Sequence, residues 1–172
     1  MSQYRRLFIK GGTYFFTVVT YERQPLLCKE PALTRLKAAF RYVMEKHPYC
    51  MDGLVILPDH LHCIWRLPEG DSNFSLRWNM LKRYFSMGID SPTNQRREKT
   101  IWQRRFWEHL IRDEDDLHRS LDYIHYNPVK HGYVEKPCDW DNSTFRHHVK
   151  RGFYDVNWGC NEITVKKQLL NE

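Results

Sequence analysis

The stretch from residue 54 to residue 67 constrains the fold more than any other part of the sequence. Residues 54–57 (Leu-Val-Ile-Leu) and residues 62–67 are both rich in side chains that favour strands. Pro58-Asp59 separates the two runs and predicts a tight connection between them. The stretch is therefore predicted to form a β-hairpin, around which the remaining elements have to be arranged.

The second half of this hairpin carries two histidines, His60 and His62, separated by one apolar residue. Successive side chains of a strand point to opposite faces, so the two imidazoles share a face and Leu61 points into the protein. Two imidazoles side by side provide half of a ligand shell for a divalent cation. Ordinary surface or core histidines give the same pattern, so this interpretation depends on partners elsewhere in the chain.

The other elements follow from apolar residues repeating with the period of a strand or of a helix. A strand at 13–20 follows Gly11-Gly12, and a helix then begins near Pro31 and is stopped by Pro48. A second helix has Asn73 or Ser72 as its cap and carries four apolar residues on one face: Phe74, Trp78, Leu81 and Phe85. A polar loop at 88–100, a strand at 101–109 and a helix from Asp113 to Tyr126, which ends at Asn127-Pro128, complete the order. The order β-α-β-β-α-β-α predicts an α+β fold: a ferredoxin-like or RRM-like sandwich, with helices packed against a mostly antiparallel sheet. We expect one domain spanning residues 1–172, with 140–172 as a C-terminal extension.

The composition narrows the class of protein and its surroundings. The chain has 172 residues, 27 basic and 21 acidic, and a net charge of +6, which favours a polyanionic partner. No apolar run approaches 18 residues, so no membrane span is expected. Five widely spaced cysteines without a C-x-x-C pair predict a reduced, cytoplasmic protein and argue against a cysteine zinc site.

The last predicted helix adds a candidate nucleophile. Tyr123 lies off the apolar stripe of that helix, and Asn127 follows one turn later on the same face. A carboxamide oxygen is an acceptable ligand for magnesium or manganese, and a phenol can attack phosphorus. Tyr126 is a rival nucleophile by chemistry, and Asn127 before Pro128 also fits a simple helix terminator.

Three motifs together resemble a known family. They are His60-Leu61-His62, the run 102–109 (Trp-Gln-Arg-Arg-Phe-Trp-Glu-His) and the run 122–132 (Asp-Tyr-Ile-His-Tyr-Asn-Pro-Val-Lys-His-Gly). In this order and spacing they are similar to the single-tyrosine HUH transposases. The opening residues 4–6 and 11–17 resemble those of the REP-associated tyrosine transposases, a domesticated bacterial branch.

The resemblance implies the HUH endonuclease fold and a metal-dependent single-stranded DNA transesterase. His60 and His62 would bind magnesium or manganese, with Asn127 at the third-ligand position, where many relatives carry glutamine or histidine. Tyr123, rather than Tyr126, would attack the scissile phosphate, giving a 5′-phosphotyrosine intermediate and a free 3′-hydroxyl for rejoining. The implied substrate is the repetitive extragenic palindrome (REP), a hairpin flanked by a short single strand. The implied protein is cytoplasmic and nucleoid-associated, monomeric as in the REP branch, with a dimer possible.

Basic and aromatic residues along the chain are candidates for DNA contact. The basic candidates, with one tyrosine, are Tyr4, Arg5, Arg6, Lys10, Lys82, Arg83, Arg104, Arg105 and Lys130. Trp102 and Trp107 could stack on unpaired bases. Two alternatives stay open: a module that binds structured single-stranded nucleic acid without cutting it, and a rolling-circle replication initiator, for which the chain shows no helicase-like segment.

Overall fold

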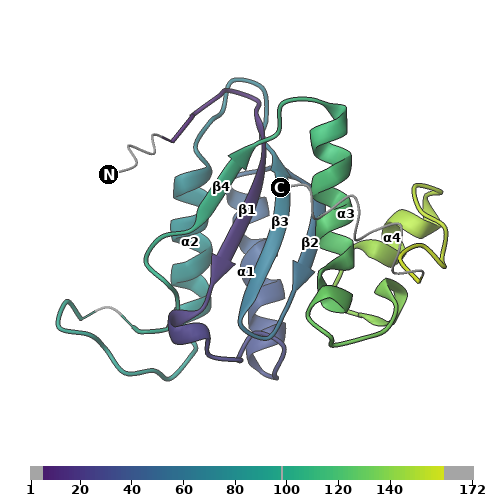
Figure 1. Cartoon of the computed structure of the whole chain (residues 1–172). Helices are drawn as coiled ribbons and strands as arrows, with labels where there is room; N and C mark the ends of the chain where they lie inside the picture. The colour runs from purple at the N-terminus through teal and green to yellow at the C-terminus, as the bar shows by residue number, and fades with distance from the viewer. Residues whose placement is uncertain (1–5, 98, 161–172) are drawn as a thin grey trace, which may run out of the picture.

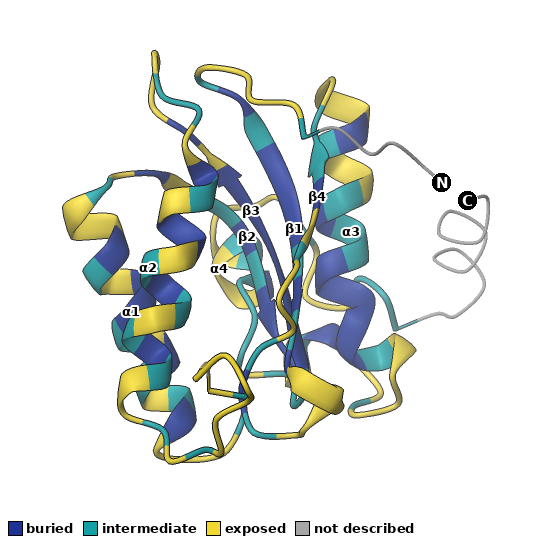
Figure 2. Cartoon of the chain, turned by 90° about the vertical axis from the view of Figure 1, so that its left-hand side faces the viewer, coloured by how far each residue is buried: buried dark blue, intermediate teal, exposed yellow. Residues whose placement is uncertain are grey.

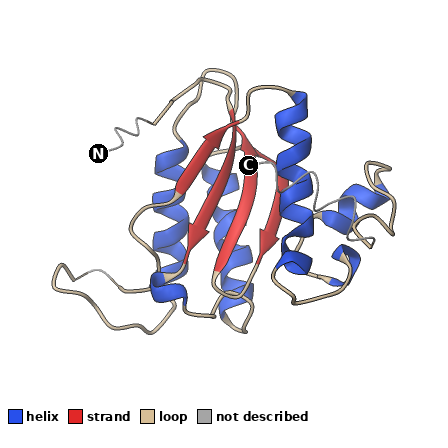
Figure 3. Ribbon diagram, viewed as in Figure 1, coloured by secondary structure: helices blue, strands red, loops and turns tan. Residues whose placement is uncertain are grey.

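The structure is a computed structural model, which describes residues 6–97 and 99–160. Its elements are β1 (Thr13–Val19), the short 3-10 helix η1 (Tyr21–Arg23), α1 (Ala32–Lys46), β2 (Cys50–Ile56), β3 (His60–Arg66), α2 (Phe74–Met87), β4 (Trp107–Leu110), α3 (Glu114–Lys130), the 3-10 helix η2 (Pro137–Asp139) and α4 (Phe145–Lys150). All neighbouring strands are antiparallel, in the order β2-β3-β1-β4 (Figure 1). The predicted ferredoxin-like sandwich is confirmed, with helices on both faces of one sheet (Figure 3).

Strand β1 shows why the sheet separates two helical layers. Tyr14, Phe16 and Val18 are buried in the larger core beneath α1 and α2, whereas Phe15 belongs to the smaller core beneath α3. The alternation of side chains along a strand produces this division. Figure 2 shows α1 and α2 on one side of the sheet and α3 on the other, each with its buried face turned inward.

The helix beginnings agree with the sequence analysis. Helix α1 starts immediately after Pro31, and α2 is capped by Asn73, whose side-chain oxygen accepts a hydrogen bond from the backbone N–H of Leu76 at 3.0 Å. Helix α3 is capped in the same way by Asp113, and its first turn is acidic, which suits the positive end of the helix dipole.

The predicted end of the last helix is wrong. Helix α3 continues through Asn127 and Pro128 to Lys130, and the carbonyl of Asn127 accepts a hydrogen bond from the backbone N–H of His131 at 3.0 Å. Proline removes one backbone hydrogen-bond donor and disfavours the helical conformation of the residue before it. So close to a helix end, tertiary packing outweighs that cost. Both residues are buried. The extra turn is what places Lys130 and His131 beside the sheet.

The strand boundaries also differ from the prediction. Strand β2 begins at Cys50 rather than Leu54, and β3 begins at His60 rather than His62. Of the predicted strand 101–109, only the part from Trp107 onward joins the sheet. Trp102 makes an isolated bridge to Thr20, and the chain then leaves the ladder as Phe106 packs its ring against the core beneath α2.

The beginning of the predicted C-terminal extension is joined to the sheet. The backbone N–H of Ile56 donates to the carbonyl of Asn142 at 2.8 Å, and that of Thr144 donates to the carbonyl of Leu54 at 2.9 Å. Residues 161–172 of the extension lie outside the described residues. None of the helices in the described part of the chain is long and apolar enough to cross a bilayer.

A buried histidine under α3 makes the fold sensitive to acid. His125 is fully buried, and its Nε2 hydrogen-bonds the hydroxyl of Thr144 at 3.0 Å. Burial, and then the nearby His148, lowers the pKa of His125 to about 3. The unfolded chain takes up this proton near pH 6.5 and the folded chain does not, so stability is lost as the pH falls from about 6.5 towards 3.

We expect this single group to cost about 2 kcal/mol of unfolding free energy between pH 6.5 and pH 5. The variant His125→Gln retains a hydrogen-bonding group for Thr144 but cannot titrate in this range. Urea unfolding at several pH values should therefore show a shallower pH dependence for the variant than for the wild type. Identical slopes would show that His125 does not govern the acid sensitivity.

Candidate active site

The two motif histidines lie side by side on the sheet face that α3 covers. The ring centroids of His60 and His62 on β3 are 5.0 Å apart. Across the antiparallel ladder, Val19 is opposite His60 and Thr17 is opposite His62. Both imidazoles are buried, His60 at 5% and His62 at 3% exposure, which is unusual for a titratable group without a purpose.

Each imidazole is held through its Nδ1 atom. Nδ1 of His60 is 2.6 Å from a carboxylate oxygen of Asp59, and Nδ1 of His62 is 2.8 Å from the hydroxyl oxygen of Thr17. When these Nδ1–H groups donate, the Nε2 atom of each ring keeps its lone pair. Such outer partners fix the tautomer and orientation of metal-binding histidines.

Electrostatics favours the neutral form of His62 and the carboxylate form of Asp59. Burial, followed by the charge of His60, holds the pKa of His62 well below its usual value, so this ring is neutral. Burial acts to raise the pKa of Asp59, but hydrogen bonds from His60 and Arg23 outweigh it and lower the value. The result is a carboxylate that can accept the proton of His60 Nδ1, next to a neutral imidazole.

Helix α3 brings Tyr123 to these histidines. Its half-buried ring lies 5.2 Å from the ring of His62 and 5.9 Å from that of Phe15, both edge-on. The ammonium nitrogen of Lys130 lies 4.7 Å from the centroid of the same ring. The two sequence features with candidate chemistry, the histidine pair and the phenol, therefore meet within one chain.

Asn127 lies one helical turn after Tyr123 and one turn before His131, whose ring is 5.2 Å from that of His60. Its side chain is fully buried, and within the described structure neither its amide oxygen nor its amide nitrogen has a hydrogen-bond partner. The same holds for Nε2 of His62. Buried polar atoms without partners are costly, so this group fits a site that binds a ligand.

Among residues 6–97 and 99–160, no three His, Cys, Asp or Glu side chains are grouped closely enough to hold a metal ion. Two imidazoles and an amide oxygen form a different ligand set, and one that suits a cation accepting both nitrogen and oxygen. The residues present therefore fit a divalent cation held by His60, His62 and Asn127.

Tyr126, the rival nucleophile, lies elsewhere. Its side chain is 5% exposed, and its ring centroid is 6.4 Å from that of Trp158 in the C-terminal segment. Its position at the packing interface with that segment supports Tyr123 as the better candidate.

Sequence reasoning missed three residues around the site. His131 continues the spacing of four from Tyr123 and Asn127, so the helical repeat could have indicated it. Asp59 directly precedes the first histidine of the motif. Thr17 could not be found from local sequence, because only the register between β1 and β3 places it opposite His62.

The predicted DNA-binding residues divide into several groups. Lys130 is exposed beside Tyr123, and Arg104 and Arg105 are exposed just before β4. Lys10 is exposed at the turn before β1. Arg83 is exposed on α2, which lies on the opposite side of the sheet from α3. Tyr4 and Arg5 lie outside the described residues.

Two of the predicted basic residues are engaged inside the protein. Arg6 is 3.2 Å from a carboxylate oxygen of Glu108, and its guanidinium lies 4.4 Å from the ring centroid of Phe106. The ammonium group of Lys82 donates to the carbonyl of Gln103 at 3.0 Å, and burial, followed by the charge of Arg6, lowers its pKa to about 8. These contacts give both residues a structural role.

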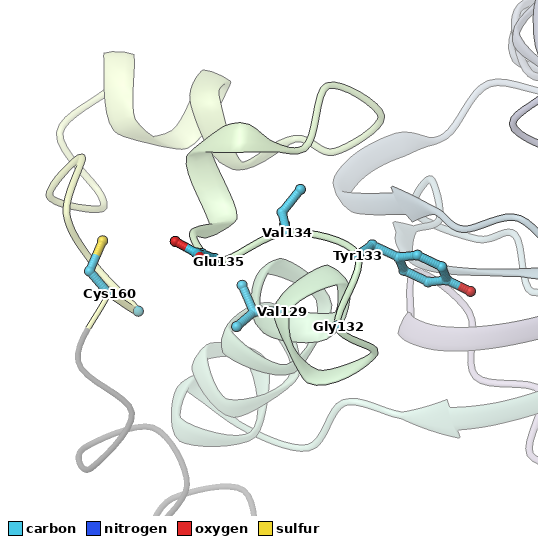
Figure 4. Close-up of a pocket in the computed structure, with 7 residues that line it drawn as sticks. Val129, Gly132, Tyr133, Val134, Glu135 and Cys160 are labelled. Atoms are coloured by element: carbon cyan, nitrogen blue, oxygen red, sulfur yellow. The ribbon is translucent and has the colours of Figure 1, made fainter.

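A cavity of about 510 Å³ lies at the end of α3, lined by Val129, Glu135, Cys160 and neighbours (Figure 4). The ring of Tyr133, which borders it, points away from the cavity and towards the sheet, and its centroid is 5.5 Å from that of Trp140. Neither His60 nor His62 lines this cavity, so it is not part of the histidine site.

Comparison with known proteins shows the family to which this chain belongs. Residues 9–127 match the family model of IS200-like transposases. A REP-associated tyrosine transposase from Escherichia coli K12 is 46% identical over 159 residues, covering 92% of this chain and 91% of the relative. A Haemophilus influenzae protein, provisionally given the same name, is 45% identical over 174 residues, covering 96% of this chain and 98% of its own.

A solved structure of a REP-associated tyrosine transposase bound to a REP hairpin superimposes on this fold with a TM-score of 0.80. It is 45% identical, and the match covers 92% of this chain and 91% of that one. The family match and the fold thus define a transposase of the IS200-like class. Within that class, the chain belongs to the REP-associated tyrosine transposases, a family of DNA-cleaving enzymes.

Proposed function

We propose that this protein cleaves and rejoins single-stranded DNA at REP elements, using Tyr123 as the nucleophile and a divalent cation held by His60, His62 and Asn127. The observation that carries the proposal is the meeting of Tyr123 with a pair of buried imidazoles whose Nδ1 atoms are both engaged. The REP hairpin bound in the related structure supports the choice of DNA.

The cleavage step would exchange one phosphodiester for another. The phenolic oxygen of Tyr123 attacks the scissile phosphorus and loses its proton, while the bond from phosphorus to the 3′-oxygen breaks and that oxygen gains a proton. The products are a 5′-phosphotyrosine and a free 3′-hydroxyl. Because the new ester keeps the energy of the old one, attack by a 3′-hydroxyl in the reverse sense releases Tyr123 and rejoins a strand.

The residues around the phosphate would divide the remaining work. Asp59 and Thr17 hold the two imidazoles in place, and Asn127 supplies an oxygen from the same helix that carries the nucleophile. When bound, magnesium or manganese would polarise the phosphate and neutralise its developing charge. Lys130, beside the ring of Tyr123, adds a fixed positive charge next to the phosphoryl group.

One chain supplies every residue of the proposed site. His60, His62, Tyr123 and Asn127 all come from one chain, and the ring contact between Tyr123 and His62 is made within it. We therefore propose a monomer as the active form. The proposed DNA substrate leads us to propose that the protein acts in the cytoplasm at the bacterial nucleoid.

A covalent capture experiment tests the proposed function. Purified protein is incubated with a labelled REP strand, a hairpin with its flanking single strand, in the presence of manganese. We expect a protein–DNA adduct that survives denaturing electrophoresis, and its loss when EDTA removes the metal. If folded protein binds the labelled strand but forms no adduct, cleavage through a phosphotyrosine is refuted.

A further inference from the structure

The free edge of the sheet carries an exposed aromatic side chain in line with the catalytic residues. Trp107 on β4 is opposite Thr17 on β1, and Thr17 is opposite His62 on β3. The three side chains therefore form one row across the same face of the sheet. With neighbouring strands about 4.8 Å apart, Trp107 is separated from His62 by about 10 Å of sheet.

The indole of Trp107 is unusually available for contact. Its residue is 51% exposed, although large aromatic side chains are normally buried. The ring of Phe15 links it to the site, with centroids 5.7 Å from Trp107 and 5.9 Å from Tyr123. The buried ring of Phe15 thus places the indole of Trp107 one ring away from the proposed nucleophile.

A second ring extends this surface and is fixed in place. The imidazole of His109 is parallel to the indole of Trp107 within 4°, with centroids 5.9 Å apart. Its Nε2 lies 2.9 and 3.0 Å from the two carboxylate oxygens of Asp116, in the first turn of α3. Asp116 also accepts a hydrogen bond from the backbone N–H of Arg112 at 3.1 Å. The helix that carries Tyr123 therefore also orients His109.

The charge beside these rings suits a nucleotide. The cavity of about 420 Å³ at this edge is not the space over the two rings, because Tyr14, Glu108 and Leu110, which also line it, belong to the opposite face of the sheet. Nε of Arg112 pairs with a carboxylate oxygen of Asp116 at 3.2 Å, but the side chain is 69% exposed, so its other guanidinium nitrogens can still reach a neighbouring phosphate. Arg104 and Arg105 are exposed just before β4.

We propose that Trp107 and His109 form a stacking platform for an unpaired base of the single strand, close to the phosphate attacked by Tyr123. The inference rests on the proposed function for its choice of DNA, but it concerns binding rather than cleavage. Every base has a flat aromatic face, so an exposed indole can hold one without reading its identity. The platform would keep the strand extended across the sheet with its backbone over the histidine pair.

Binding measured without cleavage tests the platform. The background is Tyr123→Phe in EDTA, and the probe is a fluorescein-labelled REP strand, either intact or with one flanking unpaired nucleotide made abasic in turn. By fluorescence anisotropy, Trp107→Ala should weaken binding of the intact strand about tenfold. With Trp107 present, one abasic position should weaken binding by a similar factor. In Trp107→Ala, the same abasic position should weaken binding no further. Trp107→Phe should retain most of the affinity.

A matched control is Phe153→Ala, which removes an aromatic residue that is 65% exposed in the segment after α4, and it should leave binding unchanged. If Trp107→Ala causes the same loss with every abasic strand, or no loss, the platform is refuted. The outcome is independent of the proposed function. If the effect of Trp107→Ala disappears with one abasic strand but the wild type forms no covalent adduct, the platform stands and cleavage is overturned. If the wild type forms the adduct but no abasic strand removes the effect of Trp107→Ala, cleavage stands and the platform is overturned.

Discussion

Replacing Tyr123 by phenylalanine should abolish the covalent protein–DNA adduct and slow strand cleavage by roughly four orders of magnitude or more, because it removes the attacking oxygen. The ring itself remains, so its contacts with His62 and Phe15 are kept and the fold should be unchanged. Denaturing electrophoresis with a labelled REP strand measures the adduct, and anisotropy should show that the variant still binds this strand.

Tyr126→Phe is the matched control, since it removes a phenol three residues away on the same helix. Tyr126 is buried near Trp158, so this variant should form the adduct at close to the wild-type rate. An adduct formed by Tyr123→Phe but lost in Tyr126→Phe would show that the nucleophile has been assigned to the wrong tyrosine.

The second large effect is expected from removing both imidazoles. We expect His60→Ala combined with His62→Ala to lose about a thousandfold in cleavage rate, because a metal that polarises phosphate contributes several kcal/mol to catalysis. The double variant should also lose its response to added manganese. Binding of the REP hairpin should be retained, since both histidines are buried and contribute little surface to the DNA.

His118→Ala is a suitable control for the double variant, because the His118 side chain is 63% exposed on the outer part of α3. It should cleave like the wild type. Metal-responsive cleavage by the double variant would overturn the proposed ligands. If the wild type binds DNA and cleaves none under any metal, the binding-module alternative replaces the enzyme.

Much of the fold could be predicted because its signals are local. The hairpin around Pro58-Asp59, the strand at 13–20 and the two long helices facing the larger core each follow from a repeat visible within a dozen residues. The end of α3 could not, because Pro128 is a strong local stop signal that burial against the sheet and the C-terminal segment overrides. The short extent of β4 likewise depends on how Phe106 packs in the core.

The candidate site was predictable to a similar degree. His60 with His62 and Tyr123 with Asn127 are each defined by spacing within one element, so both pairs could be identified from sequence. That the histidines and Tyr123 meet on one face of the sheet could be expected only through the family resemblance. Basic charge was a weaker guide to the DNA contacts: Lys82 also donates to the backbone carbonyl of Gln103, and its contact with DNA stays a prediction.

The central claim is that the cation and the phenol serve the same phosphate. Anomalous diffraction from crystals of Tyr123→Phe with an intact REP strand and manganese tests it most directly. We predict one manganese peak within bonding distance of Nε2 of His60 and His62 and the amide oxygen of Asn127, with a strand phosphate between it and residue 123. A manganese ion bound elsewhere, or a phosphate at the histidines with residue 123 turned away from it, would contradict the account.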